Sequence, residues 1–301
     1  MLLLGEASYQ RLYNCAESAS LWYNDFMDSD VNIVKASCKT EKFDKSKLIS
    51  SLTRAGAEEK IASNIVEHLA KELRDGMSTS EIYKHAHFLL KKEYKPAALR
   101  YSLRRAVMEL GPSGFAFEDF VAYILREKGY SAKTGEMVMG GCVAHEIDVV
   151  AWNENKLIMA EAKFHNEVGI RSDLKIALYV KARLDDLREV KHNYGKVRVL
   201  DEGWLITNTK FTSTAIHYAE CKDLKLIGWN YPKTGNLQDM IVDSGLHPIT
   251  CLTSMSSSQK KMLLSRNIVL CKTLKEDTRI LKSLGFSDQK IKAIYDEINL
   301  L

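Results

Sequence analysis

Three residues that could do chemistry together interrupt two apolar segments in HEIDVVAWNENKLIMAEAKFH. Asp148 breaks the first segment, and Glu161 and Lys163 break the second. If the segments are strands joined by a turn centred on Glu154-Asn155, Asp148 lies directly opposite Glu161, with Cβ atoms roughly 4.5–5.5 Å apart. Strand alternation then brings Lys163 to the same face as Glu161. A slip of one residue in this register would move Asp148 to the other face of the sheet.

Two carboxylates at that distance are tolerated if a cation lies between them or if one of them stays protonated. Hard oxygen ligands favour Mg²⁺ or Mn²⁺. A divalent metal held by Asp148 and Glu161 could bridge a scissile phosphate and an attacking water, and lower the pKa of that water. Lys163 would orient the water or stabilise charge on the phosphate. The spacing alone gives equal weight to a surface hairpin whose acids and lysine simply face water.

The elements around this hairpin predict an α/β sheet that is covered on both faces. An amphipathic helix in FAFEDFVAYILREKGY precedes the hairpin, and a long helix in SDLKIALYVKARLDDLREVKHNYG follows it. Further along the chain come strands in KVRVLDEGWLITNT, a helix in TSTAIHYAECKD and a strand in LKLIGWN. This succession is typical of a sheet with helices on both sides.

Asp148, twelve intervening residues and then Glu161-Ala162-Lys163 resemble the D…ExK signature of the PD-(D/E)XK nuclease superfamily. The order of the surrounding segments resembles the Mrr-like restriction endonuclease branch. The resemblance implies that Asp148 and Glu161 are metal ligands, joined by the backbone carbonyl of Ala162, and that Lys163 is catalytic. Glu118 matches the acid on the family's first helix that often completes the metal site. The alternative for Glu118 is an ordinary acid on the helix surface.

The resemblance covers residues 112–235, and four more side chains in this region have two interpretations. His145 and His165 flank the strands and could touch phosphate, although lone histidines are more often structural or solvent-facing. Tyr179 and Arg183 are one turn apart on a helix and could point towards the site and contact the DNA backbone. Alternatively, Tyr179 packs against the protein and Arg183 pairs with an acid on the surface.

A short hairpin and four helices occupy residues 31–111, and this pattern resembles the ATP-cone. That module is the regulatory nucleotide-binding domain of ribonucleotide reductases and some repressors. The resemblance places Lys35, Glu41, Lys47 and Thr79 on the family's nucleotide-contacting positions. Lysines beside a hairpin and a helix N-terminus also suit a triphosphate on physical grounds.

The cone resemblance has one departure, in the turn of its hairpin. After the first lysine the family usually has a basic residue, Asp and Gly, whereas this chain has Ala36-Ser37-Cys38 and so lacks the glycine. A cone-shaped domain that has lost its ligand is therefore one alternative. Another is a domain that binds DNA through its basic residues, which are Lys91, Lys92, Arg100, Arg104 and Arg105.

The chain is helical again from residue 246, where three short helices are predicted with breaks at Asn267 and Gly285. The segment SLGFSDQKI loosely resembles a helix-hairpin-helix module, and a plain helical cap or a dimer contact is the alternative. The predicted organisation has four parts: an unassigned N-terminal extension at 1–30, a mostly helical ATP-cone-like domain at 31–111, an α/β nuclease domain at 112–245 and a small helical tail at 246–301.

Composition sets wide limits on the partners. The formal net charge is +4, which permits a nucleic-acid partner without requiring one. The six cysteines include no CxxC pair, so neither a cysteine-based zinc site nor a disulfide framework is indicated, and reduced thiols in a cytoplasmic protein are expected. No apolar run approaches the ~18 residues that a membrane helix needs.

Taken together, these features predict an endodeoxyribonuclease that depends on Mg²⁺ or Mn²⁺ and responds to ATP or another nucleotide at the cone. The alternative is a nucleotide-responsive DNA-binding regulator with an inert nuclease fold, which would have had no need to keep Asp148, Glu161 and Lys163 together. DNA is the expected partner and a membrane is not. An RNA substrate and a homo-oligomer stay open.

Overall fold

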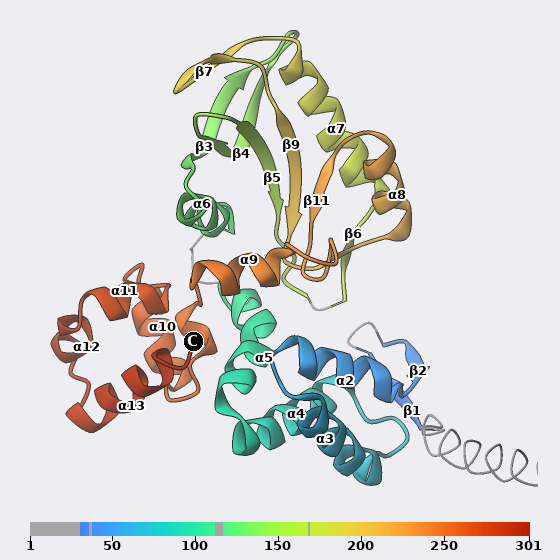
Figure 1. Cartoon of the computed structure of the whole chain (residues 1–301), viewed down its shortest axis with the longest axis vertical. Helices are drawn as coiled ribbons and strands as arrows, with labels where there is room; N and C mark the ends of the chain where they lie inside the picture. Colours follow the sequence, from blue (N-terminus) through green and yellow to red (C-terminus); the bar gives the residue numbers. More distant parts are fainter. Residues whose placement is uncertain (1–30, 36–37, 112–116, 168) are drawn as a thin grey trace, which may run out of the picture.

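The structure is a computed structural model of the 301-residue chain, and it describes residues 31–35, 38–111, 117–167 and 169–301. The N-terminal extension at 1–30 and part of the first hairpin turn lie outside the described residues. Figure 1 shows three parts that follow one another along the chain: a helical cone, a sheet with flanking helices, and a helical tail. The predicted fold class is confirmed.

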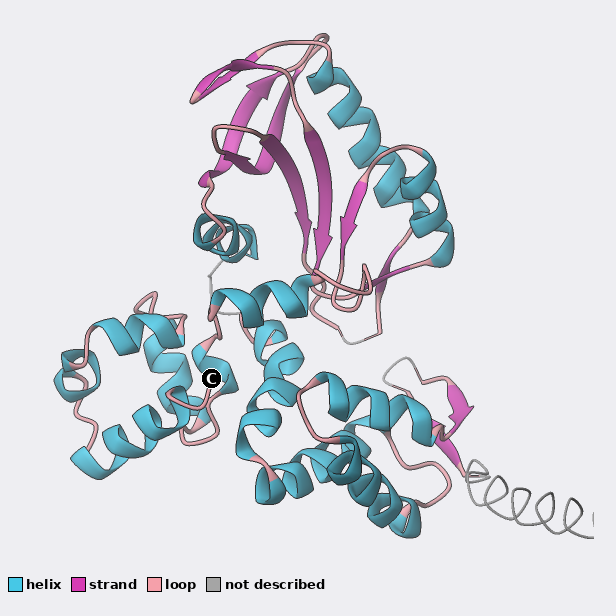
Figure 2. Cartoon of the chain, viewed as in Figure 1, coloured by secondary structure: helices cyan, strands magenta, loops and turns pink. Residues whose placement is uncertain are grey.

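The cone begins with a two-stranded antiparallel hairpin and continues with four helices (Figures 1 and 2). Its elements are β1 (Asn32–Val34), β2 (Thr40–Lys42), α2 (Lys45–Arg54), α3 (Glu59–Glu72), α4 (Thr79–Glu93) and α5 (Lys95–Met108). Local signals set the helix starts: Asp44 caps α2, and Ser78 forms a capping box with Glu81 at the start of α4. Leu52, Leu69 and Leu90 are among the buried side chains of a separate core in this part.

The nuclease part is built on a mixed five-stranded sheet of order β11-β9-β5-β4-β3. The strands are β3 (Ser131–Met139), β4 (Ala144–Trp152), β5 (Leu157–Lys163), β9 (Glu202–Thr207) and β11 (Lys225–Ile227). β3, β4 and β5 form an antiparallel meander, whereas β9 runs parallel to β5 and β11 parallel to β9. Two short pairs lie beside the sheet: β6 (Arg171–Ser172) with β10 (Lys210–Phe211), and β7 (His192–Tyr194) with β8 (Lys196–Arg198).

Helices cover the two faces of this sheet (Figure 1). Strand alternation divides the apolar side chains between the faces, so that Ile158 and Ala160 point one way and Leu157 and Met159 the other. The first face packs against α6 (Phe117–Glu127) and α9 (Leu237–Ser244). The second face packs against α7 (Leu174–Arg188) and α8 (Ser213–Cys221).

The tail is not an isolated unit, because its apolar side chains belong to the same core as α5, α6 and the sheet. Its elements are η2 (Ile249–Cys251), α10 (Ser257–Leu264), α11 (Cys271–Glu276), α12 (Arg279–Ser283) and α13 (Asp288–Ile298). The Thr250 hydroxyl donates to the Ala106 carbonyl, with an O–O distance of 2.7 Å, which ties the tail to the last cone helix.

The prediction of three tail helices is wrong in one respect, because the second helix is broken in two. The Asp277 side chain accepts hydrogen bonds from the backbone N–H and the guanidinium of Arg279, and this local bonding competes with the helical ladder. Gly285 lies in the turn between α12 and α13 with φ +77°, as expected for a residue that reverses the chain direction there.

The structure also bears on the expectations from composition. The cysteines of the described residues, 38, 142, 221, 251 and 271, are all unpaired. Within the described ranges, no helix combines the length and the apolar character that spanning a bilayer requires.

Candidate active site

The predicted register of the acidic hairpin is confirmed. Trp152 pairs with Leu157, and the register continues to the pair of Val149 with Ala160. The next position along each strand places Asp148 opposite Glu161. The turn forms where expected because the Asn153 side chain accepts from the backbone N–H groups of residues 155 and 156, each at 2.9 Å.

Asp148 and Glu161 are both partly buried, and the pKa of each carboxyl is raised above its ordinary value. Burial is the main cause for Asp148, and a 2.7 Å hydrogen bond from the Ala162 backbone N–H to its Oδ2 acts in the opposite direction. Burial also raises the pKa of Glu161, and the neighbouring Asp148 raises it further. The two acids therefore disfavour each other's charge, which is the condition that a bound cation would relieve.

Arg183 of α7 already supplies one positive charge to this pair. Its Nη1 lies 2.6 Å from Glu161 Oε2, and the two side chains are only 14% and 22% exposed. The exposed Tyr179 ring lies 5.4 Å from the Arg183 guanidinium, one helical turn away. The predicted orientation of Arg183 towards the acids is thus confirmed, whereas the alternative in which Tyr179 packs inside the protein is wrong.

The other predicted members of the cluster lie nearby. Lys163 is exposed at the end of β5, and its charge lowers the pKa values of Asp148 and Glu161. Glu118, in the first turn of α6, is part-buried; burial and the charge of Asp148 raise its pKa. Glu118 is therefore close enough to Asp148 for their charges to interact.

Sequence reasoning missed one further acid. Glu146 lies two residues before Asp148 on β4, and its charge raises the pKa values of both Asp148 and Glu118. The i, i+2 spacing on a strand was the available signal for a side chain on the same face.

His145 serves a structural contact. Its Nε2 lies 2.7 Å from Asp186 Oδ2, and Asp186 also accepts hydrogen bonds from the backbone N–H groups of Cys142 and Val143. The hydrogen bond with His145 is the largest cause that lowers the pKa of Asp186 to about 2. Gly140 makes room for this contact, since a Cβ there would lie 2.1 Å from the Asp186 carboxylate. The loop between β3 and β4 is thereby attached to α7.

His165 is also held by the protein. Its backbone N–H donates to the side chain of Asn208 at 2.8 Å, and the amide of Asn208 donates back to the His165 carbonyl at 2.9 Å. The imidazole Nε2 lies 3.0 Å from the hydroxyl of Ser172. These contacts fix the path of the chain just after Lys163, and they support the structural interpretation of this histidine.

In the cone, three of the four predicted nucleotide contacts form one charged group. Lys35 Nζ lies 2.6 Å from Glu41, and Lys47 Nζ lies 3.8 Å from the same carboxylate. Thr79 begins α4 directly after Ser78, which is bridged to the end of β1. Cys38, at the position where the family has glycine, adopts φ +59°, so the turn keeps a left-handed residue without glycine.

The basic residues of the alternative DNA-binding face make different local contacts, and that alternative stays a prediction. Lys92 lies over the Phe88 ring, and Arg105 pairs with Glu109 at 3.3 Å. Arg100 and Arg104 instead line a pocket shared with the nuclease part.

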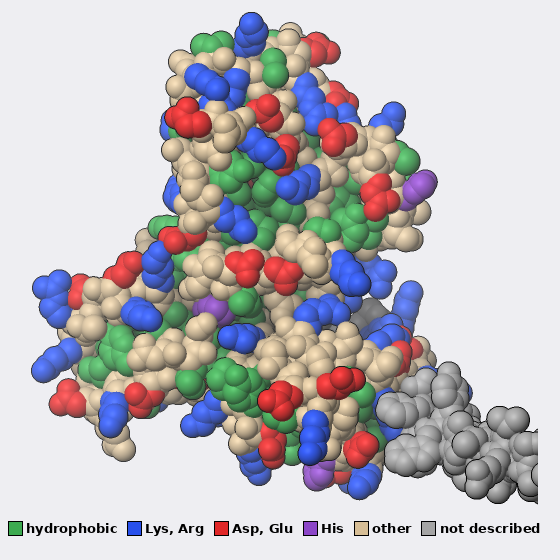
Figure 3. All heavy atoms as spheres, viewed as in Figure 1, with side chains coloured by type: hydrophobic (Ala, Val, Ile, Leu, Met, Phe, Trp, Pro, Cys, Tyr) green, Lys and Arg blue, Asp and Glu red, His purple; other side chains and the backbone are tan. Residues whose placement is uncertain are grey.

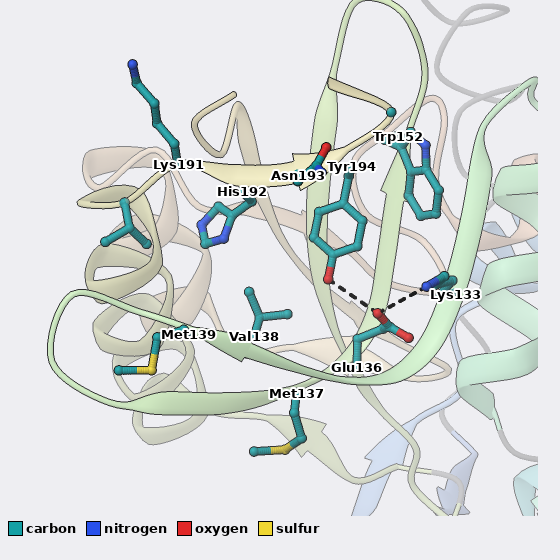
Figure 4. A pocket seen from close by; sticks show the side chains of 12 residues that line it. Lys133, Glu136, Met137, Val138, Met139, Trp152, Lys191, His192, Asn193 and Tyr194 are labelled. Carbon is teal, nitrogen blue, oxygen red and sulfur yellow. Dashed lines mark hydrogen bonds and ion pairs between the residues drawn. The ribbon is translucent and has the colours of Figure 1, made fainter. Parts of the chain in front are cut away.

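One groove of the described residues lies away from the acids. It has a volume of about 550 Å³ and lies along the β3 edge, where Glu136 accepts from the Tyr194 hydroxyl at 3.4 Å and Trp152 packs against Tyr194 (Figure 4). Asp148, Glu161 and Lys163 do not line it.

Three protein families match successive parts of the chain. Residues 31–107 match the ATP cone domain, residues 111–230 match a restriction endonuclease catalytic family, and residues 247–301 match the AF1548-like C-terminal family. The third family was not anticipated from the sequence, where the tail was compared with helix-hairpin-helix modules.

One curated relative and two solved structures are similar to the chain. An uncharacterized protein of Archaeoglobus fulgidus is 34% identical over 178 residues, which are 59% of this chain and 97% of the relative. A crystal structure of AF1548, a protein of unknown function, is 33% identical, covers 60% of this chain and 94% of its own, and has a TM-score of 0.46. The MspJI restriction endonuclease with a 27-mer oligonucleotide is 12% identical, with coverages of 70% and 42% and a TM-score of 0.25.

Proposed function

Because this chain belongs to the Mrr-like restriction endonuclease family and carries an N-terminal ATP cone, we propose that it is a metal-dependent endonuclease that hydrolyses phosphodiester bonds of DNA. The observation that carries the proposal is the pairing of two partly buried carboxylates, Asp148 and Glu161, on adjacent strands with Lys163 beside them. Their raised pKa values indicate a site that gains from a bound cation.

The residues present fit a hard divalent ion such as Mg²⁺ or Mn²⁺. Asp148 uses Oδ2 for the Ala162 N–H and Glu161 uses Oε2 for Arg183, so each carboxylate keeps its other oxygen for a ligand bond. The backbone carbonyl of Ala162 and the carboxylate of Glu118 are the proposed additional ligands. When bound, the ion would lower the pKa of an attacking water and neutralise charge on the phosphate.

The chain's own cations would complete the reaction. Lys163 is exposed beside the acids, where its ammonium can orient the attacking water or stabilise the extra negative charge on the phosphate. Arg183 is held by Glu161, and its guanidinium can donate to a phosphate oxygen through its remaining N–H groups. Tyr179 is exposed next to Arg183 and can contact the neighbouring backbone.

The test is cutting of supercoiled and linear DNA by the purified protein in Mg²⁺, Mn²⁺ or EDTA. Asp148→Ala and Lys163→Ala are compared with Lys133→Ala, which removes an exposed lysine on β3. Cutting that needs metal, disappears in the first two variants and persists in the control supports the proposal. Cutting that does not need metal, or equal cutting by all variants, would contradict the proposed metal-dependent nuclease. Incubation with single-stranded RNA in parallel decides between the two nucleic acids.

A second proposal concerns regulation, and the specific observation behind it is the cluster of Lys35, Glu41 and Lys47 beside the start of α4. We propose that ATP or another nucleotide binds there and changes nuclease activity. Cutting measured with and without ATP tests this idea. If the protein binds DNA and nucleotide but never cuts DNA, the regulator with an inert nuclease fold becomes the better description.

A further inference from the structure

A pocket of about 350 Å³ lies where the cone meets the nuclease part. The cone contributes side chains of α2 and α5, and the nuclease part contributes β10 and the segment after β11. Five cations line the pocket and no carboxylate does; the cations are Lys47, Arg54, Arg100, Arg104 and Lys210. On the face drawn in Figure 3, blue Lys and Arg side chains also gather at this junction.

Lys47 is paired with Glu41 and Asp44, but the charges of Arg100 and Arg104 in this pocket are poorly compensated. The Nε atoms of Arg100 and Arg104 are buried without a hydrogen-bond partner, and neither guanidinium forms an ion pair with any described residue. A Cβ at Gly56 would lie 2.9 Å from Arg100 Nη1, so the chain leaves space for this guanidinium. Buried donors without acceptors are costly, and they are rare unless a ligand or water satisfies them.

Lys210 brings the charge of the nuclease part into the same pocket. Desolvation is the largest cause that lowers its pKa, and the nearby cations Arg104, Arg171, Arg54 and Lys35 lower it further. Part of the side chain is still exposed to solvent, so a ligand can reach it. Cations from two parts of the chain therefore meet with no acid between them, and an anion would remove their repulsion.

We propose that this pocket binds a small anion carrying several phosphate groups, which bridges the cone and the nuclease part through Arg104 and Lys210. The volume falls in the range of small-molecule sites, roughly 300–1,000 Å³, and is too enclosed for a duplex. Guanidinium groups donate in a planar fork that matches phosphate oxygens. The pocket shares Lys47 with the predicted cone contacts, so the inference rests on the proposed nucleotide site and extends it with Arg104 and with Lys210 of the nuclease part.

The position of Lys210 offers a short route to the candidate active site. In the backbone register of the parallel strands β10 and β6, Lys210 lies beside Arg171 and Phe211 lies beside Ser172. Ser172 contacts the His165 ring, and His165 lies two residues after Lys163. An anion that draws Lys210 towards the cone would therefore act on the segment that fixes the end of β5. This consequence rests on the proposed nuclease function, whereas the binding itself does not.

The binding test uses inorganic tripolyphosphate as the probe and the full-length Lys163→Ala protein as the background, so that cutting does not interfere. Titration calorimetry should show one site per chain, and ATP in a parallel arm shows whether a base adds affinity. Arg104→Gln and Lys210→Gln should each weaken the affinity about tenfold, because each removes a charged donor. The matched control is Lys222→Gln, an exposed lysine at the end of α8.

The outcomes separate this inference from the proposed function. Weaker binding in Arg104→Gln and Lys210→Gln but not in Lys222→Gln supports it, even if the protein never cuts DNA. Equal tripolyphosphate binding in all three variants overturns it. If only a DNA duplex binds, and Lys210→Gln weakens that binding, the pocket belongs to the DNA path and the small-anion site is also overturned.

A second site is carried by an independent cluster on two cone helices. His68 and Glu72 lie one turn apart on α3, with His68 Nε2 3.1 Å from Glu72 Oε1. His85 of α4 reaches the other oxygen of the same carboxylate, with Nδ1 3.3 Å from Oε2. The three ligand atoms all lie within 4.8 Å of one another.

We infer that this cluster binds a divalent transition metal ion of the Zn²⁺ type. Two imidazoles and one carboxylate are a ligand set of zinc sites that keep a fourth position open. Ligand bonds of about 2.0–2.1 Å in a tetrahedron place ligand atoms roughly 3.3 Å apart, close to the separations found here. The cysteine spacing gave no sign of zinc because these ligands meet only when α3 packs on α4.

Co²⁺ titration tests this site, since a tetrahedral Co²⁺ complex absorbs in the visible range whether or not the protein is active. One equivalent of Zn²⁺ should also raise Tm. His68→Ala and His85→Ala should abolish both signals, whereas His217→Ala, an exposed histidine on α8, should keep them. Signals that persist in His68→Ala and His85→Ala, or no Co²⁺ absorption in the wild-type protein, contradict the inference.

Discussion

At the residue scale, the central feature is the pair of Asp148 and Glu161, whose negative charges repel each other unless a cation lies between them. Asp148 and Glu161 both have raised pKa values, so ionising them in the folded protein is unfavourable. When a carboxyl has a higher pKa in the folded than in the unfolded state, the folded protein loses stability as the pH rises from the unfolded-state pKa through the folded-state pKa. If the proposed metal site is correct, a bound cation offsets this cost at neutral pH.

The repulsion between the two carboxylates predicts that Asp148→Asn stabilises the metal-free protein. The amide oxygen can still accept from the Ala162 N–H, while the repulsion with Glu161 disappears. We expect a gain on the order of 1 kcal/mol at pH 7 in EDTA, measured by urea unfolding. The gain should shrink as the pH falls and Asp148 becomes protonated, because the raised pKa of this carboxyl makes it lose its charge earlier than an ordinary aspartate. A variant less stable than wild type at pH 7 would contradict the charge conflict.

The contact between Arg183 and Glu161 predicts how nuclease activity depends on pH. Arg183 lowers the pKa of Glu161, so Arg183→Gln should raise that pKa and leave less carboxylate available to hold metal at a given pH. The acid limb of the pH–rate profile should therefore move to higher pH. Arg188→Gln on the same helix, which pairs with other acids, is the control. An unchanged acid limb would show that Arg183 does not act on Glu161.

At the element scale, the hairpin could be predicted because its signals are local. Asn153 fixes the turn, and the strand alternation fixes which side chains share a face. The partner of Glu161 was less certain, since Arg183 reaches it only after α7 packs on the sheet. Glu146 was missed although its spacing from Asp148 pointed to it. The metal ligands themselves stay predictions.

The β3–β4 loop predicts an acid-sensitive contact. Asp186 is the shared acceptor for this loop, and its hydrogen bonds lower its pKa from the ordinary value of an aspartate to about 2. A lowered folded-state pKa adds stability above the unfolded value and loses it as the pH falls through the folded value. Asp186→Asn should therefore lower Tm at pH 7 and have less effect at pH 2. A difference in Tm that is equal at both pH values would contradict this role.

The first cone turn predicts a stabilising substitution. Cys38 holds φ +59°, a conformation that glycine adopts without steric cost. Cys38→Gly should therefore stabilise the protein by about 0.5–1 kcal/mol in urea unfolding. Cys38→Ala keeps the Cβ and should give no such gain, so a larger gain from alanine would point to the thiol rather than the backbone.

At the scale of the whole molecule, the sequence indicated the order of the parts but not how they join. The cone and nuclease resemblances rest on motifs within single segments, and the family matches confirm both. The tail looked separate, yet its core is continuous with α5, α6 and the sheet. The basic pocket needed Arg104 and Lys210, which are far apart in the chain, and no local pattern connects them.

The measurement that tests the central claim most directly is Mn²⁺ binding, followed by electron paramagnetic resonance or calorimetry. If Asp148 and Glu161 hold the ion, wild-type protein and Lys163→Ala should bind Mn²⁺ with similar affinity, because the lysine is not a ligand. Asp148→Asn and Glu161→Gln should each bind at least about tenfold more weakly. Wild-type affinity in both carboxylate variants would contradict the assignment of this hairpin as the metal site.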